Sequence, residues 1–559
     1  MKGKIFFLII IPVFLYVFLL PVMPLMEPDE ARYSDIASLM NRTGDYVTPH
    51  LNHVVYLEKP PLCYWATALA FKIFGENEFS SRLFVALCAW GCIFLVYRIG
   101  TFFHDEKSGL YSAGVLSTFI YFSILGKVNI LDIPLALFVC LATWAGYRYF
   151  AGDCQRKRWL YLLYVGSALA FLTKGLIGIV FPFAIAILWL LISKRWRDVF
   201  RLFSPVGIIL FLLISCPWII LVQKANQDFL WFFFIREHFL RYTTTIHSRN
   251  HTILFYIPFV LLGTLPWSAF LLKAFREGAD KRTPLFRATE KHFLLAWILF
   301  IFIFFSFSSS KMIPYIAPIF LPIAVFWGPL FRSYEDRNLI PEEGRGRRFF
   351  YDLPIILQSL ILITLIILPL VVKSMKLREY LENSHVERWS WLLIPPVLFQ
   401  IMMIFLPALV QRKWRKGWFL TVTVLSALFL ISIHFPISRL LTPRRSAYPL
   451  SQAIHGLLPP NQELIQFGMS LYGIDFYNKI RTPLVHAGGE LKFGFSQLPS
   501  EERSRYNLSL EELFNRWKKN GDIYCVTRYK KNVEILRSKF STLEILWHNK
   551  EFYLLRLRC

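Results

Sequence analysis

Runs of about twenty consecutive apolar residues recur along most of this chain, and they restrict its possible folds more than any other feature. A helix of that length crosses the hydrocarbon core of a bilayer, which is about 30 Å thick. A soluble chain of 559 residues would divide its apolar residues into amphipathic patterns, whereas here 55% of the residues are hydrophobic and only 18% are charged. We therefore predict a polytopic α-helical membrane protein.

Hydropathy predicts about thirteen transmembrane helices. Their expected positions are 5–25, 79–102, 108–126, 129–149, 159–173, 175–193, 203–222, 253–272, 292–309, 312–331, 352–372, 390–410 and 417–436. The first run follows two lysines and lacks a small-x-small cleavage site, so we interpret it as an uncleaved anchor rather than a signal peptide. The short connections at 126–129, 173–175 and 309–312 predict tight helical hairpins.

The net charge of +25 is carried largely by short loops between the apolar runs, as in 156–158 and 194–201. Loops rich in Lys and Arg stay on the cytoplasmic side of a membrane, and their cations attract anionic lipids. The charge therefore indicates orientation rather than a nucleic-acid partner. It predicts a cytoplasmic N-terminus and, with an odd number of spans, a C-terminus on the outer side.

The expected organisation is a transmembrane domain over 1–438 and a small α/β domain over 439–559, where the composition ceases to be membrane-like. Two long outer loops, 27–78 and 223–252, interrupt the transmembrane domain. They are the longest outer segments of this domain, so we expect functional residues in them.

The first outer loop is expected to contain two interfacial helices. Pro28 suits the first turn of a helix, and Thr43-Gly44 ends its apolar periodicity. Pro60-Pro61 opens a second helix, Leu62 to Phe74, which Gly75 ends. This second helix is apolar nearly all round, which predicts a position in the interface or against the spans.

In the C-terminal domain, Ser509 and Glu512 form a capping box for a helix that ends near Asn520-Gly521. Asp522 to Thr527 is typical of a buried strand, and Leu543 to Leu557 of two strands about a turn. These elements predict the small α/β fold.

Several classes of site are missing from the sequence. It contains no Asp-x-Asp pair, no phosphate-binding Gly-x-x-x-x-Gly-Lys-Ser/Thr loop and no dinucleotide Gly-x-Gly-x-x-Gly, which argues against an ATP-driven pump or a nicotinamide enzyme. Neither the eight cysteines nor the outer histidines have a zinc spacing, so no cofactor is predicted and a divalent-metal requirement stays open. Cys525 and Cys559 are either a disulfide in an oxidising space or two free thiols.

Polar residues that are distant in sequence collect at the outer ends of the predicted spans. They are Asp29, Glu30 and Arg32; Glu58 and Lys59; Lys127, Asn129 and Asp132; Lys174; Arg236, Glu237, His238 and Arg241; and Lys311 with Tyr315. Acids in a first helical turn also complement the helix dipole, and lysines at span ends also anchor helices in the interface. Asp132, a few residues inside a predicted span, favours function, because charge there is costly unless used.

Motifs along the whole chain carry a resemblance to a known family. In the outer loops and spans they are E-P-D-E-A-R-Y at 27–33, G-D-Y-V-T-P-H-L-N at 44–52, E-K-P-P-L-x-Y-W at 58–65, F-G-E-N-E-F-x-x-R-L at 74–83, N-I-L-D-I-P-L-A-L-F at 129–138, T-K-G at 173–175, E-H-F-L-R at 237–241, L-P-W at 265–267 and S-K-M-I-P-Y-I-A-P at 310–318. The C-terminal domain adds G-G-E-L-K-F-G at 488–494. The chain resembles the lipid A 4-amino-4-deoxy-L-arabinose transferases, a branch of the protein-mannosyltransferase-like group. The resemblance implies the C-type membrane glycosyltransferase fold. It also implies sugar transfer from undecaprenyl phosphate to a lipid A phosphate at the periplasmic face of the bacterial inner membrane.

The resemblance also implies roles for individual residues. Asp29 corresponds to the central acid of the family, with Glu30 beside it, and Asp132 to a second important acid. Lys59 corresponds to the residue that holds the lipid phosphate. The predicted catalytic residues are Asp29, Glu30 and Asp132, and the predicted substrate-binding residues are Arg32, Glu58, Lys59, Lys174, Glu237, His238, Arg241, Lys311 and Tyr315.

Other readings stay open from the sequence. The acceptor could be a protein or another glycan, as for a protein O-mannosyltransferase. A polytopic lipid or sugar transporter would place polar residues at mid-span in two similar halves, and no clear repeat is present. A structural assembly factor would not need so many charges at one membrane face. No feature indicates an oligomer, so we expect a monomer.

Overall fold

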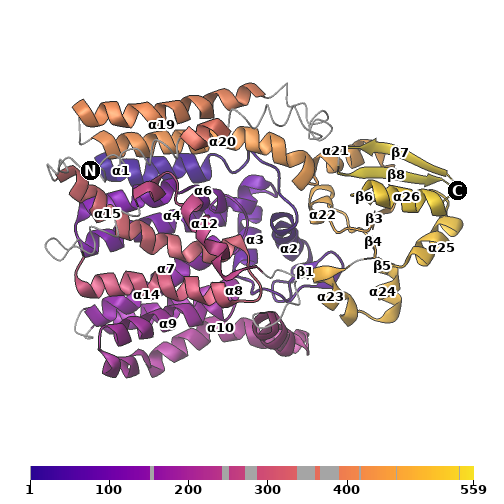
Figure 1. Cartoon of the computed structure of the whole chain (residues 1–559). Coiled ribbons are helices and arrows are strands. Elements are labelled where there is room, and N and C mark those ends of the chain that lie inside the picture. The colour runs from indigo at the N-terminus through magenta and orange to yellow at the C-terminus, as the bar shows by residue number, and fades with distance from the viewer. Residues whose placement is uncertain are drawn as a thin grey trace.

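The computed structural model describes residues 2–151, 156–241, 251–270, 286–336, 359–364, 390–413, 417–460 and 462–558, except residues 487, 541 and 550. Long helices lie side by side in a bundle, and a smaller α/β part, residues 446–558, stands at one end of it (Figure 1). We call these residues the C-terminal part. The N-terminus lies at the opposite end of the bundle (Figure 1).

The described segments of the bundle include six helices that are long and apolar enough to cross a membrane. The elements of the bundle are α1 (Lys2–Ile5), η1 (Phe6–Ile10), η2 (Val13–Val17), α4 (Glu78–Phe103), α5 (Glu106–Thr118), α6 (Ile120–Leu125), α7 (Asp132–Ala151), α8 (Lys157–Lys174), α9 (Ile177–Ile192), η3 (Trp196–Leu202), α10 (Pro205–Ala225), η4 (Trp231–Leu240), η5 (Ile253–Phe255), α12 (Tyr256–Gly263), η6 (Trp267–Phe270), α14 (Ala288–Phe307), η7 (Ile313–Ile319), α15 (Phe320–Asp336), η8 (Ser390–Leu393), α19 (Ile394–Lys413) and α20 (Trp418–Arg445).

Among the described residues, the predicted first span, 5–25, is helical only as far as Val17, and two further spans are interrupted. The span expected over 108–126 divides at Phe119, whose backbone is extended, into α5 and α6. The span expected over 253–272 stops being helical at Gly263, because Pro266 disfavours helical backbone in the residue before it. The two breaks meet, since the Ile120 N–H donates to the Leu265 carbonyl oxygen (3.4 Å). The span expected over 352–372 lies largely outside the described residues.

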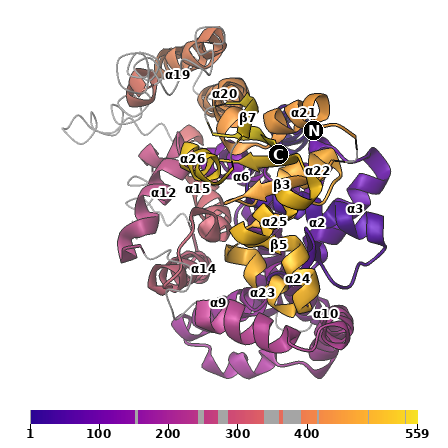
Figure 2. The same cartoon turned by 90° about the vertical axis from the view of Figure 1, so that its right-hand side faces the viewer.

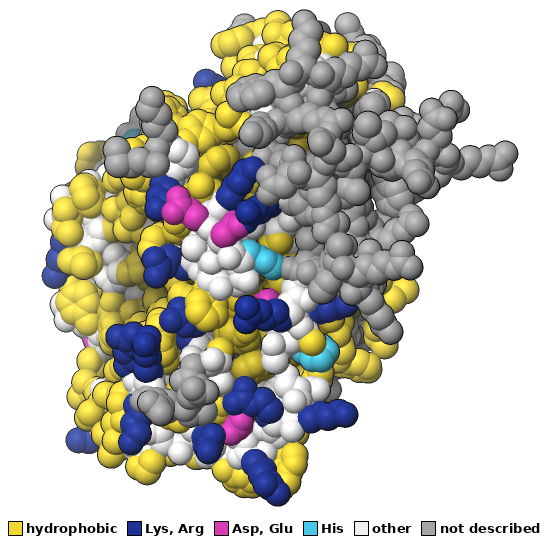
Figure 3. Space-filling model, turned by 90° about the vertical axis from the view of Figure 1, so that its left-hand side faces the viewer, with side chains coloured by type: hydrophobic (Ala, Val, Ile, Leu, Met, Phe, Trp, Pro, Cys, Tyr) yellow, Lys and Arg dark blue, Asp and Glu magenta, His cyan; other side chains and the backbone are white. Residues whose placement is uncertain are grey.

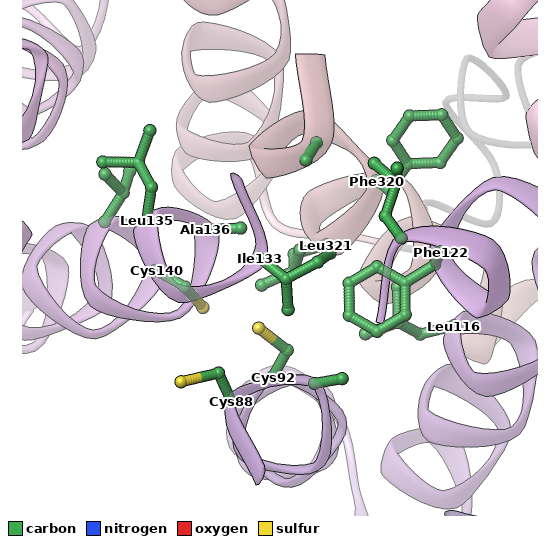
Figure 4. Packing of buried hydrophobic residues seen from close by; sticks show 14 of the residues in the cluster. Cys88, Cys92, Leu116, Phe122, Ile133, Leu135, Ala136, Cys140, Phe320 and Leu321 are labelled. Atoms are coloured by element: carbon green, nitrogen blue, oxygen red, sulfur yellow. The ribbon is translucent and has the colours of Figure 1, made fainter. Parts of the chain in front are cut away.

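The centre of the bundle is tightly packed around α4 and α7. Cys88, Cys92 and Cys140 lie there among Ile133 and Leu321, all nearly without solvent exposure (Figure 4). The three cysteines are free thiols, so they act as small apolar side chains, as expected from their positions in spans.

The first outer loop folds against the end of the bundle. Its elements are α2 (Asp29–Thr43), the hairpin of β1 (His50–Leu51) and β2 (Val54–Val55), and α3 (Leu62–Phe74). Both predicted helices are confirmed. Gly44 ends α2 in the left-handed conformation (φ 75°) that glycine adopts without strain. α2 is buried along most of its length between α3 and the C-terminal part.

The C-terminal part contains a six-stranded sheet in the order β5-β4-β3-β6-β8-β7. The first four strands in this order are parallel, β8 pairs antiparallel with β6, and β7 pairs antiparallel with β8. The strands are β3 (Leu464–Phe467), β4 (Leu484–Val485), β5 (Asn507–Leu508), β6 (Ile523–Thr527), β7 (Thr542–His548) and β8 (Tyr553–Arg558).

Helices surround this sheet and connect it to the bundle. They are α21 (Tyr448–Leu457), α22 (Tyr472–Asn478), η10 (Gly489–Leu491), α23 (Lys492–Gln497), α24 (Ser500–Tyr506), α25 (Leu510–Asn520) and α26 (Lys530–Lys539). The predicted capping box of Ser509 and Glu512 is present at the start of α25. Cys525 is a buried free thiol in β6, and Cys559 lies outside the described residues.

The C-terminal part covers the end of the bundle where the first outer loop lies (Figure 2). The helix α20 continues past residue 438, the predicted end of the transmembrane domain, to Arg445, and it leads directly into the C-terminal part. Its last residue, Arg445, accepts a hydrogen bond from the Glu27 N–H (2.6 Å). α22 packs on α2, so the first loop is held between the bundle and the sheet.

Candidate active site

A cavity of about 270 Å³ lies where the bundle, the first outer loop and the C-terminal part meet. The predicted site residues Asp29, Glu30, Arg32, Glu58, Lys59, Asp132, Lys174, Arg241 and Tyr315 all line it. Three others, Glu237, His238 and Lys311, do not belong to its lining. Lys127, Asn129 and Arg236 of the predicted polar ring also lie off the cavity.

Asp29 and Arg32 stand at the start of α2 and form an ion pair with each other. Arg32 forms a second ion pair with Glu490 of η10, so one guanidinium lies between two carboxylates. The Arg32 side chain is only 3% exposed and rests on the rings of Tyr33 and Tyr56, whereas the Asp29 side chain is 38% exposed. Arg32 is therefore a fixed part of the wall, and the Asp29 carboxylate is accessible from the cavity.

The sequence analysis missed Glu490. It belongs to the G-G-E-L-K-F-G motif, which carries the family resemblance but gives no indication of where in space this acid lies. The ion pair with Arg32 joins residues that are hundreds of positions apart. The motif itself was the only available signal.

Glu30 is placed differently from the prediction of a catalytic acid. Its carboxylate is 1% exposed and forms a two-pronged ion pair with Arg82 of α4 (2.6 and 2.8 Å). The same oxygens accept hydrogen bonds from the N–H groups of Met26 (2.9 Å) and Asn129 (3.0 Å). Every strong acceptor position is thereby occupied, so these contacts make Glu30 a structural anchor of the cavity wall rather than a free base.

Asp132 is the first residue of α7 and not, as expected, a residue inside a span. At a helix N-terminus the dipole favours a carboxylate. Asp132 also forms a short ion pair with Lys174 at the end of α8 (2.5 Å). The Lys174 ammonium lies 4.6 Å from the centre of the Tyr315 ring, which completes this side of the cavity.

Lys59 and Arg241 place two more cations in the lining of the cavity. Lys59 Nζ donates to the backbone oxygen of Glu58 (3.0 Å). Burial, together with the nearby Arg241 guanidinium, lowers the pKa of Lys59 to about 8. Arg241 donates to Glu237 (3.0 Å) and to the Tyr315 hydroxyl (3.1 Å), and it lies 4.0 Å from Glu58.

The three predicted substrate-binding residues that miss the cavity have local partners. Glu237 forms an ion pair with Arg241 and so fixes the orientation of its guanidinium. Lys311 Nζ folds back to donate to the Ser308 carbonyl oxygen (2.7 Å). His238 accepts from the Leu176 N–H (3.2 Å) and its Nδ1 lies 2.6 Å from the Phe233 carbonyl oxygen. These three residues lie outside the cavity lining, and their assignment as substrate-binding residues stays a prediction.

His238 also explains a glycine in the α8–α9 turn. Gly175 has φ +82°, and a Cβ built there would lie 2.1 Å from His238 Nε2. Burial lowers the pKa of His238 to about 4, so the ring is neutral near pH 7. The histidine thus holds the turn that follows Lys174.

Glu27 connects the cavity to the C-terminal part. Its carboxylate accepts from the N–H groups of Gly473 (2.7 Å) and Tyr472 (3.3 Å) at the start of α22. Burial raises the pKa of Glu27 to about 8. Glu27 therefore caps α22 and not α2, the helix that follows it in the sequence.

Within the described segments, no group of three or more His, Cys, Asp and Glu side chains is arranged to hold a metal ion. The charged groups that the cavity offers are instead paired carboxylates and cations. Such an arrangement suits a ligand that carries its own charge.

Comparisons with known proteins agree with this architecture. Residues 58–221 match the family model of dolichyl-phosphate-mannose-protein mannosyltransferase. The chain is 32% identical over 319 residues to an undecaprenyl phosphate-alpha-4-amino-4-deoxy-L-arabinose arabinosyl transferase of Aeromonas hydrophila, covering 56% of this chain and 57% of the relative. It is 32% identical over 345 residues to a second such transferase, from Pseudomonas fluorescens, covering 60% and 61%. The matched region thus spans about three fifths of these curated relatives.

The solved structures extend the similarity to the whole chain. The crystal structure of ArnT from Cupriavidus metallidurans bound to undecaprenyl phosphate covers 99% of this chain and 98% of its own, with a TM-score of 0.84 and 23% identity. The same protein in the apo state gives a TM-score of 0.82. This chain is therefore a multi-pass membrane protein with the C-type glycosyltransferase fold.

The three comparisons point to the same kind of protein. The curated relatives are named as aminoarabinose transferases and the similar solved structures are of ArnT, so this chain is similar to the lipid A aminoarabinose transferases. The motifs at 27–33 and 58–65, which indicated this family in the sequence, contribute Asp29, Arg32, Glu58 and Lys59 to the cavity.

Proposed function

We propose that this protein transfers 4-amino-4-deoxy-L-arabinose from undecaprenyl phosphate to a phosphate group of lipid A. The relatives of Aeromonas hydrophila and Pseudomonas fluorescens are named for a donor of this kind, and the similar ArnT structure holds undecaprenyl phosphate. The observation that carries the proposal is the cavity itself, where Asp29 faces Lys59, Arg241 and Lys174 beside the end of a membrane-spanning bundle.

The position of the cavity suits a lipid-linked donor. It lies at the end of the bundle that bears the first outer loop, so a prenyl chain could stay in the bilayer while its phosphate enters the site. Among the charged side chains visible on the opposite end of the bundle, Lys and Arg outnumber Asp and Glu (Figure 3). By the positive-inside rule this charge favours a cytoplasmic position for that end and a periplasmic position for the cavity.

The reaction requires positive charge more than proton transfer. The bond between the sugar C1 and the donor phosphate oxygen breaks, and undecaprenyl phosphate leaves with the electron pair of that bond. An oxygen of the lipid A phosphate forms the new bond to C1 from the opposite face, with inversion. A phosphate monoester has its second pKa near about 6, so this nucleophile is already ionised near neutral pH.

Each cavity residue then has a role in this displacement. Lys59 and Arg241 stabilise the charge that develops on the leaving phosphate, and arginine can contact two of its oxygens at once. Lys174 is held in place by Asp132 and adds to the same positive region. Asp29, which is exposed to the cavity, orients the acceptor and stabilises the developing positive charge on the sugar.

Transfer can be tested with purified protein in detergent, undecaprenyl-phosphate-aminoarabinose and lipid A, with the product followed by mass spectrometry. We expect the mass of one aminoarabinose to be added to lipid A, and no transfer to a protein or glycan acceptor offered in parallel. Asp29→Asn should lower the rate about 100-fold or more, because it removes the carboxylate that stabilises the positive charge on the sugar. Asp228→Asn, the same change at an exposed loop carboxylate, is the matched control. Full activity of Asp29→Asn would remove this residue from the mechanism.

A further inference from the structure

The cavity is divided electrically into two sides. On one side Lys59 and Arg241 oppose Glu58 and Glu237, and Lys59 Nζ donates to a backbone oxygen rather than to a carboxylate. On the other side a single guanidinium, Arg32, serves both Asp29 and Glu490. Two carboxylates with one cation leave this second side with one negative charge in excess.

The neighbouring groups do not cancel this excess. Lys174 is already paired with Asp132, and Arg82 with Glu30. Glu27 is the other acid of the lining near Asp29, and burial raises its pKa to about 8, so it is largely protonated near pH 7 and leaves the count unchanged. The spare negative charge therefore belongs to Asp29 and Glu490.

We propose that Glu490 is a specificity-determining residue that binds the amino group of the donor sugar. This inference rests on the proposed function. A lipid-linked amino sugar is a zwitterion, with an anionic phosphate diester at C1 and an ammonium group elsewhere on the ring. The ammonium fits the negative excess beside Glu490, and the phosphate fits Lys59 and Arg241, where the Lys59 ammonium donates to a backbone oxygen rather than to a carboxylate.

The position of Glu490 suits this role. It lies on η10, at the edge of the C-terminal part that faces the cavity, and its side chain is 26% exposed. A carboxylate has about four acceptor positions, so the ion pair with Arg32 leaves room for an ammonium donor. Arg32 cannot move with the Glu490 side chain, because it is 3% exposed and packed against Tyr33 and Tyr56.

A charged recognition site also explains rejection of the wrong sugar. A neutral N-acyl sugar offers no cation, so its binding would cover the excess negative charge of this side without neutralising it, which disfavours the wrong donor. Asp29 remains beside the reacting carbon, so the two acids that share Arg32 divide acceptor orientation and sugar selection between them.

The experiment compares two donors on undecaprenyl phosphate, the free amino sugar and its N-acetylated form, with wild type, Glu490→Gln and Glu490→Asp. Glu490→Gln keeps the size and a hydrogen bond to Arg32 but removes the charge. We expect kcat/KM for the amino donor to fall about 10- to 100-fold, mainly through KM, with little change for the N-acetylated donor. Glu490→Asp should retain most of the preference for the amino donor.

Glu501→Gln on α24, an exposed acid of the same C-terminal part, is the matched control and should behave as wild type. An equal loss with both donors, an unchanged amino donor KM, or a change confined to the lipid A KM would each overturn the assignment of Glu490. Thermal unfolding of each variant identifies a folding defect. Failure of the wild type to transfer either donor would instead refute the proposed function.

Discussion

The buried ion pair between Glu30 and Arg82 makes a quantitative prediction. Both side chains are about 1% exposed and are joined by two short contacts. Arg82 also donates to the carbonyl oxygens of Leu20, Met23 and Pro24, in the turn segment that follows η2. Arg82→Met removes all these donors and leaves a carboxylate buried without its partner.

Breaking one partner of a buried ion pair costs about 3–5 kcal/mol. Backbone carbonyls left without donors add to this loss, at about 1–3 kcal/mol for each that water cannot reach. Since folded proteins are stable by only about 5–15 kcal/mol, we expect Arg82→Met to remove a large share of the stability. The assay is thermal unfolding of the purified protein in detergent, followed by intrinsic fluorescence and size exclusion.

The controls separate the loss of a partner from the loss of any arginine. Arg158→Met, at an exposed position on α8, should unfold as wild type does. Glu30→Gln combined with Arg82→Met should be more stable than Arg82→Met alone, because no unpaired charge remains. The reasoning would be refuted by an Arg82→Met protein that unfolds at the wild-type temperature, or by a double variant that is no more stable than the single one.

Three further predictions concern pH and the α8–α9 turn. Burial lowers the pKa of Lys59 to about 8, so the rate of transfer should fall as the pH rises through about 8 and Lys59 loses its charge. Lys59→Arg should move this fall to higher pH. An unshifted pH profile would exclude Lys59 as the phosphate ligand. Burial raises the pKa of Asp35 to about 7 and also raises that of Asp475, so the unfolding free energy should fall as pH rises from about 4 to 7. Asp35→Asn should flatten this slope in thermal unfolding, and an unaltered slope would contradict it. Gly175→Ala should cost about 1–3 kcal/mol of stability, since its Cβ would meet His238, with partial recovery in Gly175→Ala/His238→Ala; wild-type stability of the single variant would disprove the clash.

The elements that the sequence predicted well are those with local signals. α2 and α3 begin after prolines and end at Gly44 and Gly75, residues whose backbone preferences hold in any surroundings. The polar ring also succeeded in part, because charges at the outer ends of spans must share one membrane depth. A shared membrane depth was enough to predict that Asp29, Lys59 and Asp132 lie near one another, and all three line the cavity.

What the sequence could not supply was the choice of partner. Glu30 and Asp29 are adjacent acids, yet their surroundings differ. Arg82, 52 positions away, pairs with Glu30, whereas Asp29 stays accessible from the cavity. Lys311 and His238 looked equivalent to Lys174 and Arg241, but they are turned to nearby backbone groups. Glu490 entered the cavity through the packing of the C-terminal part, which no local pattern encodes.

The continuity of α20 has a mechanical consequence. Its 28 residues extend about 42 Å, which exceeds the hydrocarbon thickness of about 30 Å by roughly two helical turns. The C-terminal part is thus joined to the bundle by a continuous helix rather than by a flexible linker. Because a helix longer than the bilayer is thick can adapt by tilting, we expect acyl-chain length to affect how the C-terminal part, which carries Glu490, meets the rest of the cavity. Lipid chain length is therefore a variable to hold constant in every reconstituted assay of this protein.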